Sequence, residues 1–363
     1  MKLEDILGYL QQIAPLDLAA DWDNVGLLLG DAGADTKRII TCLTVTPAVV
    51  AEAVDDKVNL IITHHPILFR ATKKLTAATT EGRMLLDLAR AGIAVYSAHT
   101  AFDNAAGGIN DMIAERLQLT EVRPLRRRSV QQFKIVVFTP EGDLAKVSDA
   151  MFAAGAGGIG QYNECSFRIP GTGTFFGTES TNPAVGQKGR REEVAEIRLE
   201  VICTAECLDT VVAAMRRAHS YEEPAYDIYP LKPTPAAVGE GRFGRLAKPM
   251  PLGKLAKSVQ KALAANSVQV VGDDKRLVQS IAIVCGAGGE MLRDAQSAKS
   301  DMFLTGEMRF HDCLAAEASG LSVLLPGHYA TERFGMEEMA GRLQAQFPAL
   351  KVWPSSREHD PVS

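Results

Sequence analysis

The sequence has few of the features that mark secreted, membrane-spanning or disulfide-linked proteins. Its six cysteines contain no C-x-x-C pair, and the closest two, Cys203 and Cys207, lack a second pair to complete a zinc knuckle. No apolar run is long enough to span a membrane, and the first residues carry acids where a signal peptide carries bases. A cytoplasmic protein with reduced thiols is therefore expected.

Basic charge is also scarce. Lys and Arg number 39 against 44 Asp and Glu, and the net charge of −5 argues against a protein that binds nucleic acid by neutralising phosphates. The one dense basic run, residues 126–128, is expected to be a solvated linker rather than a phosphate site. Aromatic residues make up only 6% of the chain, but 46% is hydrophobic, as in a globular protein. A length of 363 residues predicts two or three domains.

Strand and helix patterns alternate at both ends of the chain, which predicts α/β lobes with largely parallel sheets. In the first lobe we expect helices over 3–14, 47–55, 81–91 and 107–117, and strands over 26–30, 39–43, 58–62 and 93–97. In the last lobe we expect helices over 252–265, from 290 and over 331–344, and strands over 280–285, 302–305 and 321–325.

The middle of the chain has a different pattern, with the β-α-β-β-α-β order of a ferredoxin-like unit. We therefore predict an inserted α+β domain at 129–235, between an N-terminal lobe at 1–128 and a C-terminal lobe at 236–363 that form one discontinuous metal-binding unit. The glycine run at 155–160 matches no phosphate-binding spacing, so a loop is expected there. Residues 171–177 are predicted as a turn with a short strand, and helix and strand patterns resume after a Pro/Gly-rich stretch at 232–244.

The strongest functional signal is a pair of adjacent histidines, His64 and His65, which end an apolar strand just before Pro66. Ligands of open α/β sheets bind beyond the carboxyl ends of strands. Because neighbouring strand residues point to opposite faces, the two histidines are expected to bind two neighbouring ions, one each. For this motif alone, the alternative is a capped strand with one buried, hydrogen-bonded histidine.

A second cluster follows the next strand, where His99 offers a nitrogen ligand and Asp103 a hard oxygen ligand. Taken alone, Asp103 could equally be a helix cap. Earlier in the chain, Asp21 and Asp23 flank Trp22 and could line a pocket, although a turn with Asx hydrogen bonds explains them as well.

A third cluster contains His328 and Glu332, which are four residues apart at a helix start and can share one face. A capping group with a surface glutamate would also explain this pair. However, five of the seven histidines follow predicted strand ends, which scattered core histidines would not do. These five are His64, His65, His99, His311 and His328.

Together these clusters supply enough ligands for two divalent ions per chain, provided that one group bridges them. Their mixed nitrogen and oxygen donors suit zinc, iron or manganese, and paired ions of this kind activate water for hydrolysis. His99, His311 and Asp23 are expected beside the ligands or in the substrate pocket. The predicted ligands are His64, His65, Asp103, His328 and Glu332.

The same stretches resemble the dinuclear-metal-centre family named for the NGG-interacting factor, whose bacterial members are labelled GTP cyclohydrolase I type 2 homologues. The resemblance covers nearly the whole chain. It implies the same five ligands and a toroidal homohexamer whose metal sites face an inner cavity. The inserted segment is similar to the copper-tolerance (CutA-like) and nitrogen-regulatory (PII-like) trimeric folds. The matching motifs are DWDNVGL at 21–27, THHPILF at 63–69, AHTAFDN at 98–104, TGEMRFHD at 305–312 and GHYATE at 327–332.

Three residues depart from the family pattern. Thr44 stands where many relatives carry an acid, Phe310 where a second histidine is frequent, and Ser220 where the insert usually has proline. None of them is a predicted ligand. The first two are expected to act on groups next to the ligands, and so on substrate choice.

Two functions fit these observations. The first is a metal-dependent hydrolase of a C–N or ester-type bond, for which the family label implies a nucleotide substrate and GTP ring opening. The chain lacks the Cys/His zinc constellation expected of the main GTP cyclohydrolase class. The second is a non-catalytic metal-binding assembly in which the insert senses a ligand or gates the cavity.

Overall fold

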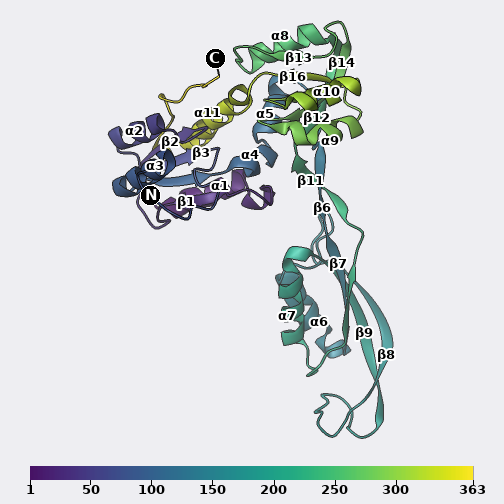
Figure 1. The fold of residues 1–363 in the computed structure, drawn as a ribbon. Coiled ribbons are helices and arrows are strands. Elements are labelled where there is room, and N and C mark those ends of the chain that lie inside the picture. The colour runs from purple at the N-terminus through teal and green to yellow at the C-terminus, as the bar shows by residue number, and fades with distance from the viewer. Residues whose placement is uncertain (363) are drawn as a thin grey trace. The chain divides into compact units, whose positions relative to one another are not determined.

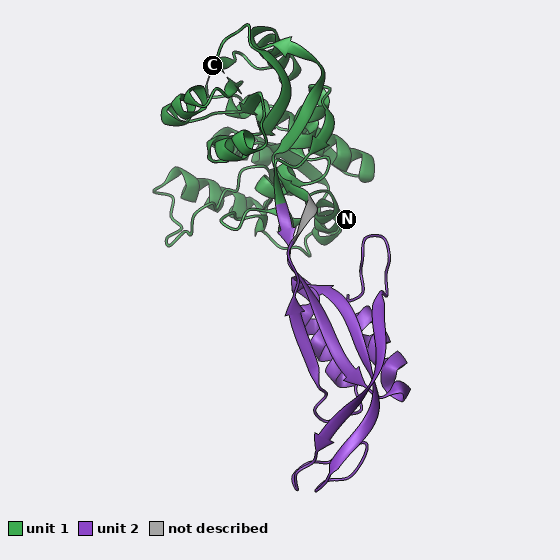
Figure 2. Ribbon diagram, turned by 90° about the vertical axis from the view of Figure 1, so that its right-hand side faces the viewer, with its two compact units in different colours: residues 1–127, 237–363 green, residues 128–236 purple. Residues whose placement is uncertain are grey.

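The computed structural model describes residues 1–362, apart from the side chains of 234–237. It divides into two compact units, which are coloured separately in Figure 2. Unit 1 combines Met1–Arg127 with Ala237–Ser363, and unit 2 is Arg128–Ala236. The two ends of the chain therefore fold together, and each unit is described by itself below.

The first sheet of unit 1 has five strands in the order β1-β4-β3-β2-β17. All neighbours pair in parallel except β1, which runs antiparallel to β4. The strand β17 comes from the C-terminal end of the chain and pairs with β2. The elements of this region are α1 Leu3–Ile13, η1 Leu16–Leu18, β1 Gly26–Leu29, β2 Arg38–Cys42, α2 Pro47–Asp55, β3 Leu60–Thr63, α3 Thr80–Ala91, β4 Ala94–Ser97, α4 His99–Asn104, α5 Ile109–Arg116 and β17 Lys351–Pro354.

The second sheet of unit 1 has six strands in the order β13-β16-β15-β14-β12-β5. Its centre, β14-β15-β16, is parallel, and its outer strands pair antiparallel. The elements are β5 Thr120–Arg123, β12 Arg242–Pro251, α8 Leu252–Ala262, β13 Gln269–Val271, β14 Leu277–Val284, η4 Gly288–Met291, α9 Leu292–Ser297, β15 Met302–Thr305, α10 Phe310–Ala318, β16 Ser322–Leu325 and α11 His328–Gln346.

The long helix α11 joins the two sheets of unit 1 into one body (Figure 1). It packs against β2 and β17 of the first sheet and against α5. Its buried residues Met336, Met339 and Leu343 belong to a single hydrophobic core that includes Ile39 of β2 and Ile281 of β14. The carboxyl ends of strands from both sheets are therefore held in one rigid core.

Unit 2 is a four-stranded antiparallel sheet in the order β10-β7-β9-β8. Two helices, α6 and α7, pack on each other, and their buried residues share a core with Ile135 and Val137 of β7. The elements are β7 Gln132–Thr139, η2 Glu141–Asp143, α6 Leu144–Ala153, β8 Ser166–Phe176, β9 Arg191–Thr204, η3 Ala205–Cys207, α7 Leu208–Ala218 and β10 Tyr226–Pro230. A separate two-stranded ribbon pairs β6 Arg126–Val130 with β11 Thr234–Glu240.

The turn predicted within residues 171–177 is wrong. Residues 171–176 belong to the single strand β8, which pairs with β9 along its whole length. Pro170 fits because β8 is an edge strand, where a missing amide need not break the ladder. The Pro/Gly-rich stretch at 232–244 contains β11 and the start of β12, whose pairing partners lie more than 30 residues away in sequence. Tertiary pairing therefore overrides local Pro and Gly content.

All six cysteines are free. Among residues 1–362, no helix combines the length and the apolar character needed to cross a membrane.

Removing unit 2 should leave unit 1 folded. Gly239 lies against the backbone of Arg126, so the two ends that would be rejoined are neighbours. We expect a chain in which residues 128–236 are replaced by a short Gly/Ser linker to unfold cooperatively in urea and to bind the same amount of divalent metal as the full chain. Loss of soluble expression would show that unit 1 depends on unit 2.

Candidate metal centre

His64 and His65 follow β3 on a backbone that is held from both sides. Their amides donate to the carbonyls of Cys42 and Leu43 at 3.0 and 2.8 Å, which extends the pairing with the β2 strand. The Ser97 hydroxyl donates to the carbonyl of His64 at 2.6 Å. Both imidazoles therefore start from a fixed edge of the first sheet.

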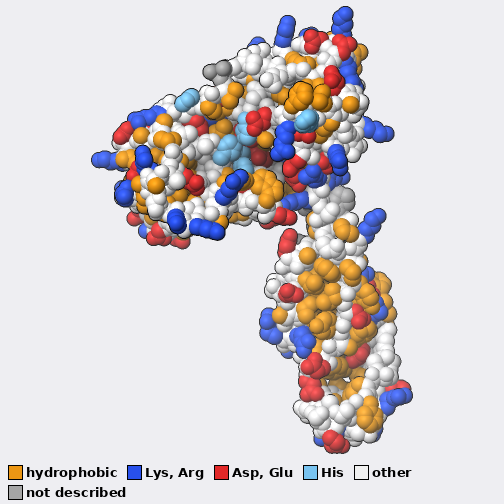
Figure 3. Space-filling view, in the orientation of Figure 1, with side chains coloured by type: hydrophobic (Ala, Val, Ile, Leu, Met, Phe, Trp, Pro, Cys, Tyr) orange, Lys and Arg blue, Asp and Glu red, His pale blue; other side chains and the backbone are white. Residues whose placement is uncertain are grey.

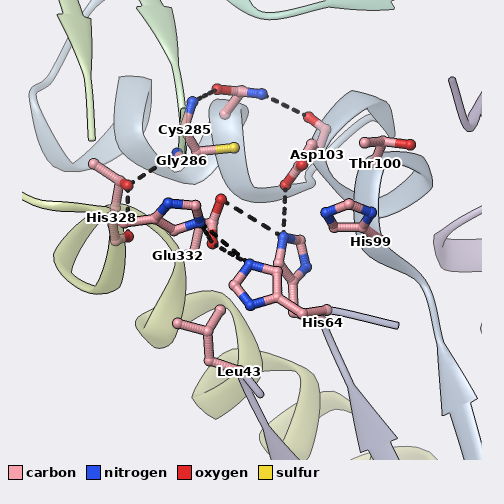
Figure 4. A network of polar contacts seen from close by, with 12 residues as sticks. Leu43, His64, His99, Thr100, Asp103, Cys285, Gly286, His328 and Glu332 are labelled. Atoms are coloured by element: carbon pink, nitrogen blue, oxygen red, sulfur yellow. Dashed lines mark hydrogen bonds and ion pairs between the residues drawn. The ribbon is translucent and has the colours of Figure 1, made fainter. Parts of the chain in front are cut away.

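The helix α4 supplies His99 and Asp103. Because it is only six residues long, it has no hydrophobic periodicity and was not expected from the sequence. His99 begins it with φ of 28°, an uncommon value for a residue other than glycine. Asn110 donates to the carbonyl of Asp103 at 3.0 Å. Figure 4 shows His99 and Asp103 beside His64.

The start of α11 supplies His328 and Glu332, whose Nε2 and Oε2 atoms are 2.9 Å apart. Three glycines make room for this approach. Gly327 turns the chain into the helix with φ of 102°. A Cβ on Gly286 would lie 2.1 Å from Glu332 Oε1, and a Cβ on Gly306 would lie 2.8 Å from the Cα of His328. The signal for these roles in the sequence is the position of Gly286 and Gly306 just after strand ends.

The Glu332 carboxylate lies between two groups of side chains. Its Oε2 is 3.0 Å from His65 Nε2 and 2.9 Å from His328 Nε2, and these two nitrogens are 3.2 Å apart. Its Oε1 is 3.8 Å from His64 Nε2, which is 3.5 Å from Asp103 Oδ1. Each group offers three ligand atoms within 4.8 Å of one another. The five side chains singled out from the sequence therefore lie together (Figure 4).

Buried polar atoms at this position lack hydrogen-bond partners. Among the described residues, His64 Nδ1, His64 Nε2 and Asp103 Oδ1 have none. Burial lowers the pKa of His64 well below its usual range, so the ring is neutral at pH 7. Burial would raise the pKa of Glu332, but the neighbouring His64, His328 and His65 hold it well below its usual range. Neutral imidazoles and an ionised carboxylate are the forms that bind metal.

His99 and Asp23 form a hydrogen-bonded pair beside this cluster. His99 Nδ1 is 2.7 Å from Asp23 Oδ1, and the Thr100 amide donates to Asp23 Oδ2 at 3.2 Å. The Asp23 side chain is fully buried. His99 also lies within ligand distance of His64 and His65. Burial would raise the pKa of Asp23, but its hydrogen bonds from His99 and Thr100 lower it.

His311, by contrast, lies outside this cluster. It is exposed on α10 next to Phe310, whose ring is 71% exposed, and it joins none of the groups described above.

Thr44 touches a ligand candidate directly, because its Oγ1 is 2.7 Å from His65 Nδ1. Its amide and that of Leu43 donate to the carboxylate of Glu358 at 2.7 and 3.0 Å. Arg333 forms an ion pair with Glu358, with Nε and Oε2 2.9 Å apart. The role of Glu358 could not be predicted, since it is more than 300 residues from Thr44 in sequence.

Figure 3 shows histidine side chains gathered on one face of unit 1, next to acidic and apolar side chains. A pocket of about 170 Å³ opens beside them. It is lined by Trp22, His99, Asp103, His328 and Glu332 among others. The cluster is therefore accessible from outside although its His64 and Glu332 are buried.

Known proteins share both the sequence and the fold. The model of the family Duf34/NIF3 (NGG1p interacting factor 3) matches residues 1–361. A Bacillus subtilis protein named GTP cyclohydrolase 1 type 2 homolog is 37% identical over 328 residues, which cover 90% of this chain and 88% of that protein. A Mycobacterium tuberculosis protein of the same name is 36% identical over 96% of this chain and 93% of its own.

A solved structure shows the same mixed α/β fold with several sheets. The crystal structure of a Bacillus cereus protein related to NIF3 has a TM-score of 0.79 and 32% identity, and the match covers 100% of this chain and 99% of that one. The family model, the named relatives and this structure agree over almost the full length. The chain therefore belongs to the Duf34/NIF3 family.

Proposed function

We propose that this chain is a metal-dependent hydrolase that holds two divalent ions. The observation that carries the proposal is the position of Glu332, whose two carboxylate oxygens face two separate groups of side chains. One ion would be held by His65, His328 and Glu332, and the other by His64, Asp103 and Glu332.

The buried atoms without partners support this assignment. An unpaired buried polar group costs free energy, and His64 and Asp103 together contain three such atoms. A bound cation would satisfy them. The mixture of imidazole and carboxylate donors fits zinc, iron or manganese. Divalent ions at such a site act as Lewis acids that favour hydrolysis.

The chain's own residues would orient the ligands and handle protons. Thr44 Oγ1 fixes the Nδ1 side of His65, which leaves Nε2 free for an ion. Asp23 in the same way holds Nδ1 of His99, so Nε2 of His99 is the nitrogen that can accept a proton from water. The substrate would enter through the pocket lined by Trp22 and His99. The names of the relatives suggest a nucleotide such as GTP.

Unit 2 and the assembly are part of the same proposal. The element order of unit 2, with strand order β10-β7-β9-β8, supports a ferredoxin-like insert. We propose a toroidal homohexamer, as the family resemblance implies. Large apolar side chains are exposed on both faces of β8, Phe167 and Ile169 on one and Phe176 on the other, and offer surfaces for association. The free thiols support a cytoplasmic location.

Metal analysis with an activity screen tests the proposal. Purified, metal-loaded protein is assayed against nucleotides including GTP, phosphoesters and cyclic amides, and its metal content is measured by elemental analysis. We expect two ions per chain and hydrolysis of one of these classes that stops on chelation. Two bound ions without hydrolysis would favour the non-catalytic assembly. Absence of metal uptake would contradict the ligand assignment.

Metal binding should release protons. In the metal-free chain, burial and the charge of Glu332 raise the pKa of Asp103 to about 7. Burial would lower the pKa of His328, but hydrogen bonds to Glu332 and Glu307 raise it to about 9. Both groups must lose their protons to bind an ion, so we expect affinity for Zn²⁺ to increase from about pH 6 to pH 9.

Calorimetry in two buffers of different ionisation enthalpy measures this proton release. The Asp103→Asn variant is the control, since it has no proton to lose at that position and should release fewer protons per ion at pH 7. Equal heats in both buffers for the unmodified chain would show that the ligands are already deprotonated.

A further inference from the structure

Two exposed aromatic rings stand beside the candidate metal centre, and one of them lines the proposed substrate pocket. Trp22 is 57% exposed and Phe69 is 48% exposed. Large apolar side chains at the mouth of a polar site commonly mark a binding surface.

The loops that carry the two rings are fixed. Asn24 Nδ2 donates to the carbonyl of Leu68 at 2.6 Å, which ties the Trp22 loop to the Phe69 loop. The carboxylate of Asp23, the residue after the tryptophan, accepts hydrogen bonds from the amides of Thr100 in α4 and of Asn24. The exposed rings are therefore pre-positioned, which lowers the entropic cost of binding a ligand.

Both aromatic rings contact the histidine cluster through His99. Trp22 and Phe69 meet edge to face with centroids 5.9 Å apart, and they lie 6.0 and 6.3 Å from His99. His99 in turn lies 5.2 Å from His64 and 5.6 Å from His65. An aromatic wall, defined as Trp22, Phe69 and His99, thus leads from the surface to the ligand candidates.

The volume of the pocket beside this wall limits the size of the ligand that can bind there. The pocket lined by Trp22 and His99 has a volume of about 170 Å³, well below the roughly 300–1,000 Å³ of sites for drug-sized ligands. It has room for one ring-sized group but not for a helix or a peptide strand. Glu290 also lines it and offers carboxylate oxygens that accept hydrogen bonds. A ring with N–H donors fits such a wall better than a hydrocarbon ring.

We propose that the aromatic wall of Trp22, Phe69 and His99 binds the planar nitrogen heterocycle of the substrate. This inference rests on the proposed function, because it assigns the wall to the substrate of that site. The heterocycle of the substrate stacks or packs edge-on against Trp22. The substrate bond to be hydrolysed then reaches the candidate metal centre through the pocket. Aromatic stacking of this kind tolerates different heterocycles, since each has a π-face.

Trp22 itself can report binding, because the chain has only two tryptophans. In a Trp353→Phe background, we expect guanosine to quench the remaining fluorescence saturably, and ribose 5-phosphate, which has no aromatic nitrogen heterocycle, to leave it unchanged. The titration uses metal-free protein prepared with a chelator. A failure of the ring proposal is thereby distinguished from a failure to bind metal, which elemental analysis measures separately.

Phe69→Ala in this background should raise the Kd for guanosine about 10-fold, as expected for loss of an aromatic partner. The matched control is Phe310→Ala, which removes another exposed phenylalanine away from the cluster and should leave the Kd unchanged. Circular dichroism checks that both variants are folded. Absence of saturable quenching by guanosine, equal quenching by ribose 5-phosphate, or equal Kd values for the two variants would each overturn the proposal.

Discussion

Replacing Glu332 with glutamine should remove at least one divalent ion per chain, together with any hydrolysis. The glutamine side chain would keep the shape of the bridge but lose the negative charge between the two ions. Two cations at the roughly 4 Å spacing of dinuclear sites would then repel each other without an intervening anion. The measurement is metal content per chain after gel filtration, with hydrolysis assayed on the same samples.

Two variants control this experiment. Glu337→Gln removes a charge from the same helix at a side chain that is 56% exposed, and it should keep both ions. His311→Ala removes a histidine that lies outside the cluster and should also keep near-normal metal content. If Glu332→Gln retains both ions while His311→Ala loses one, the ligand set proposed here is wrong at these positions.

Replacing Arg242 with alanine should destabilise unit 1 by about 3–5 kcal/mol, as expected when one partner of a buried ion pair is removed. The Arg242 side chain is only 5% exposed and pairs with Asp111. Its guanidinium also donates to the carbonyls of Asn104 and Ala105, at the end of the helix that carries Asp103. The arginine therefore links the second sheet to the metal centre.

Urea unfolding followed by circular dichroism measures this effect. Arg245→Ala on the same strand is the control, because Arg245 makes one hydrogen bond, to Gln279 at 3.2 Å, and its loss should cost about 1 kcal/mol or less. Equal urea midpoints for the two variants would show that Arg242 contributes no more to the stability of unit 1 than Arg245 does.

The elements that could be predicted from sequence are those with strong local signals. The helix α2 begins with Thr46 as its cap and Pro47 in its first turn, and its predicted bounds are confirmed. Buried strands such as β15 were visible as short apolar runs with polar residues after them. Polar residues after apolar strands also indicated His64, Asp103 and His328 as site residues, because parallel strands present their carboxyl ends at one edge of the sheet.

The features that could not be predicted depend on residues far apart in sequence. The Thr44 hydroxyl meets His65, but the group that fixes the Thr44 backbone is Glu358. The glycine that makes room for Glu332 is Gly286, and its position after a strand end does not reveal which side chain it faces. A short helix such as α4, with six residues, has no periodicity to detect. Local patterns therefore locate the ends of elements but not the partners that complete a site.

The pairing of β17 with β2 has a consequence for how the protein is made. Residues 351–354 form one edge of a sheet whose other four strands lie between residues 26 and 97, so this sheet stays incomplete until residue 354 has left the ribosome. The four-stranded sheet of unit 2, whose pairings lie between residues 132 and 230, can fold during synthesis. The nascent first lobe meanwhile exposes the open edge of β2, which makes it a candidate client for chaperones that shield unpaired strands.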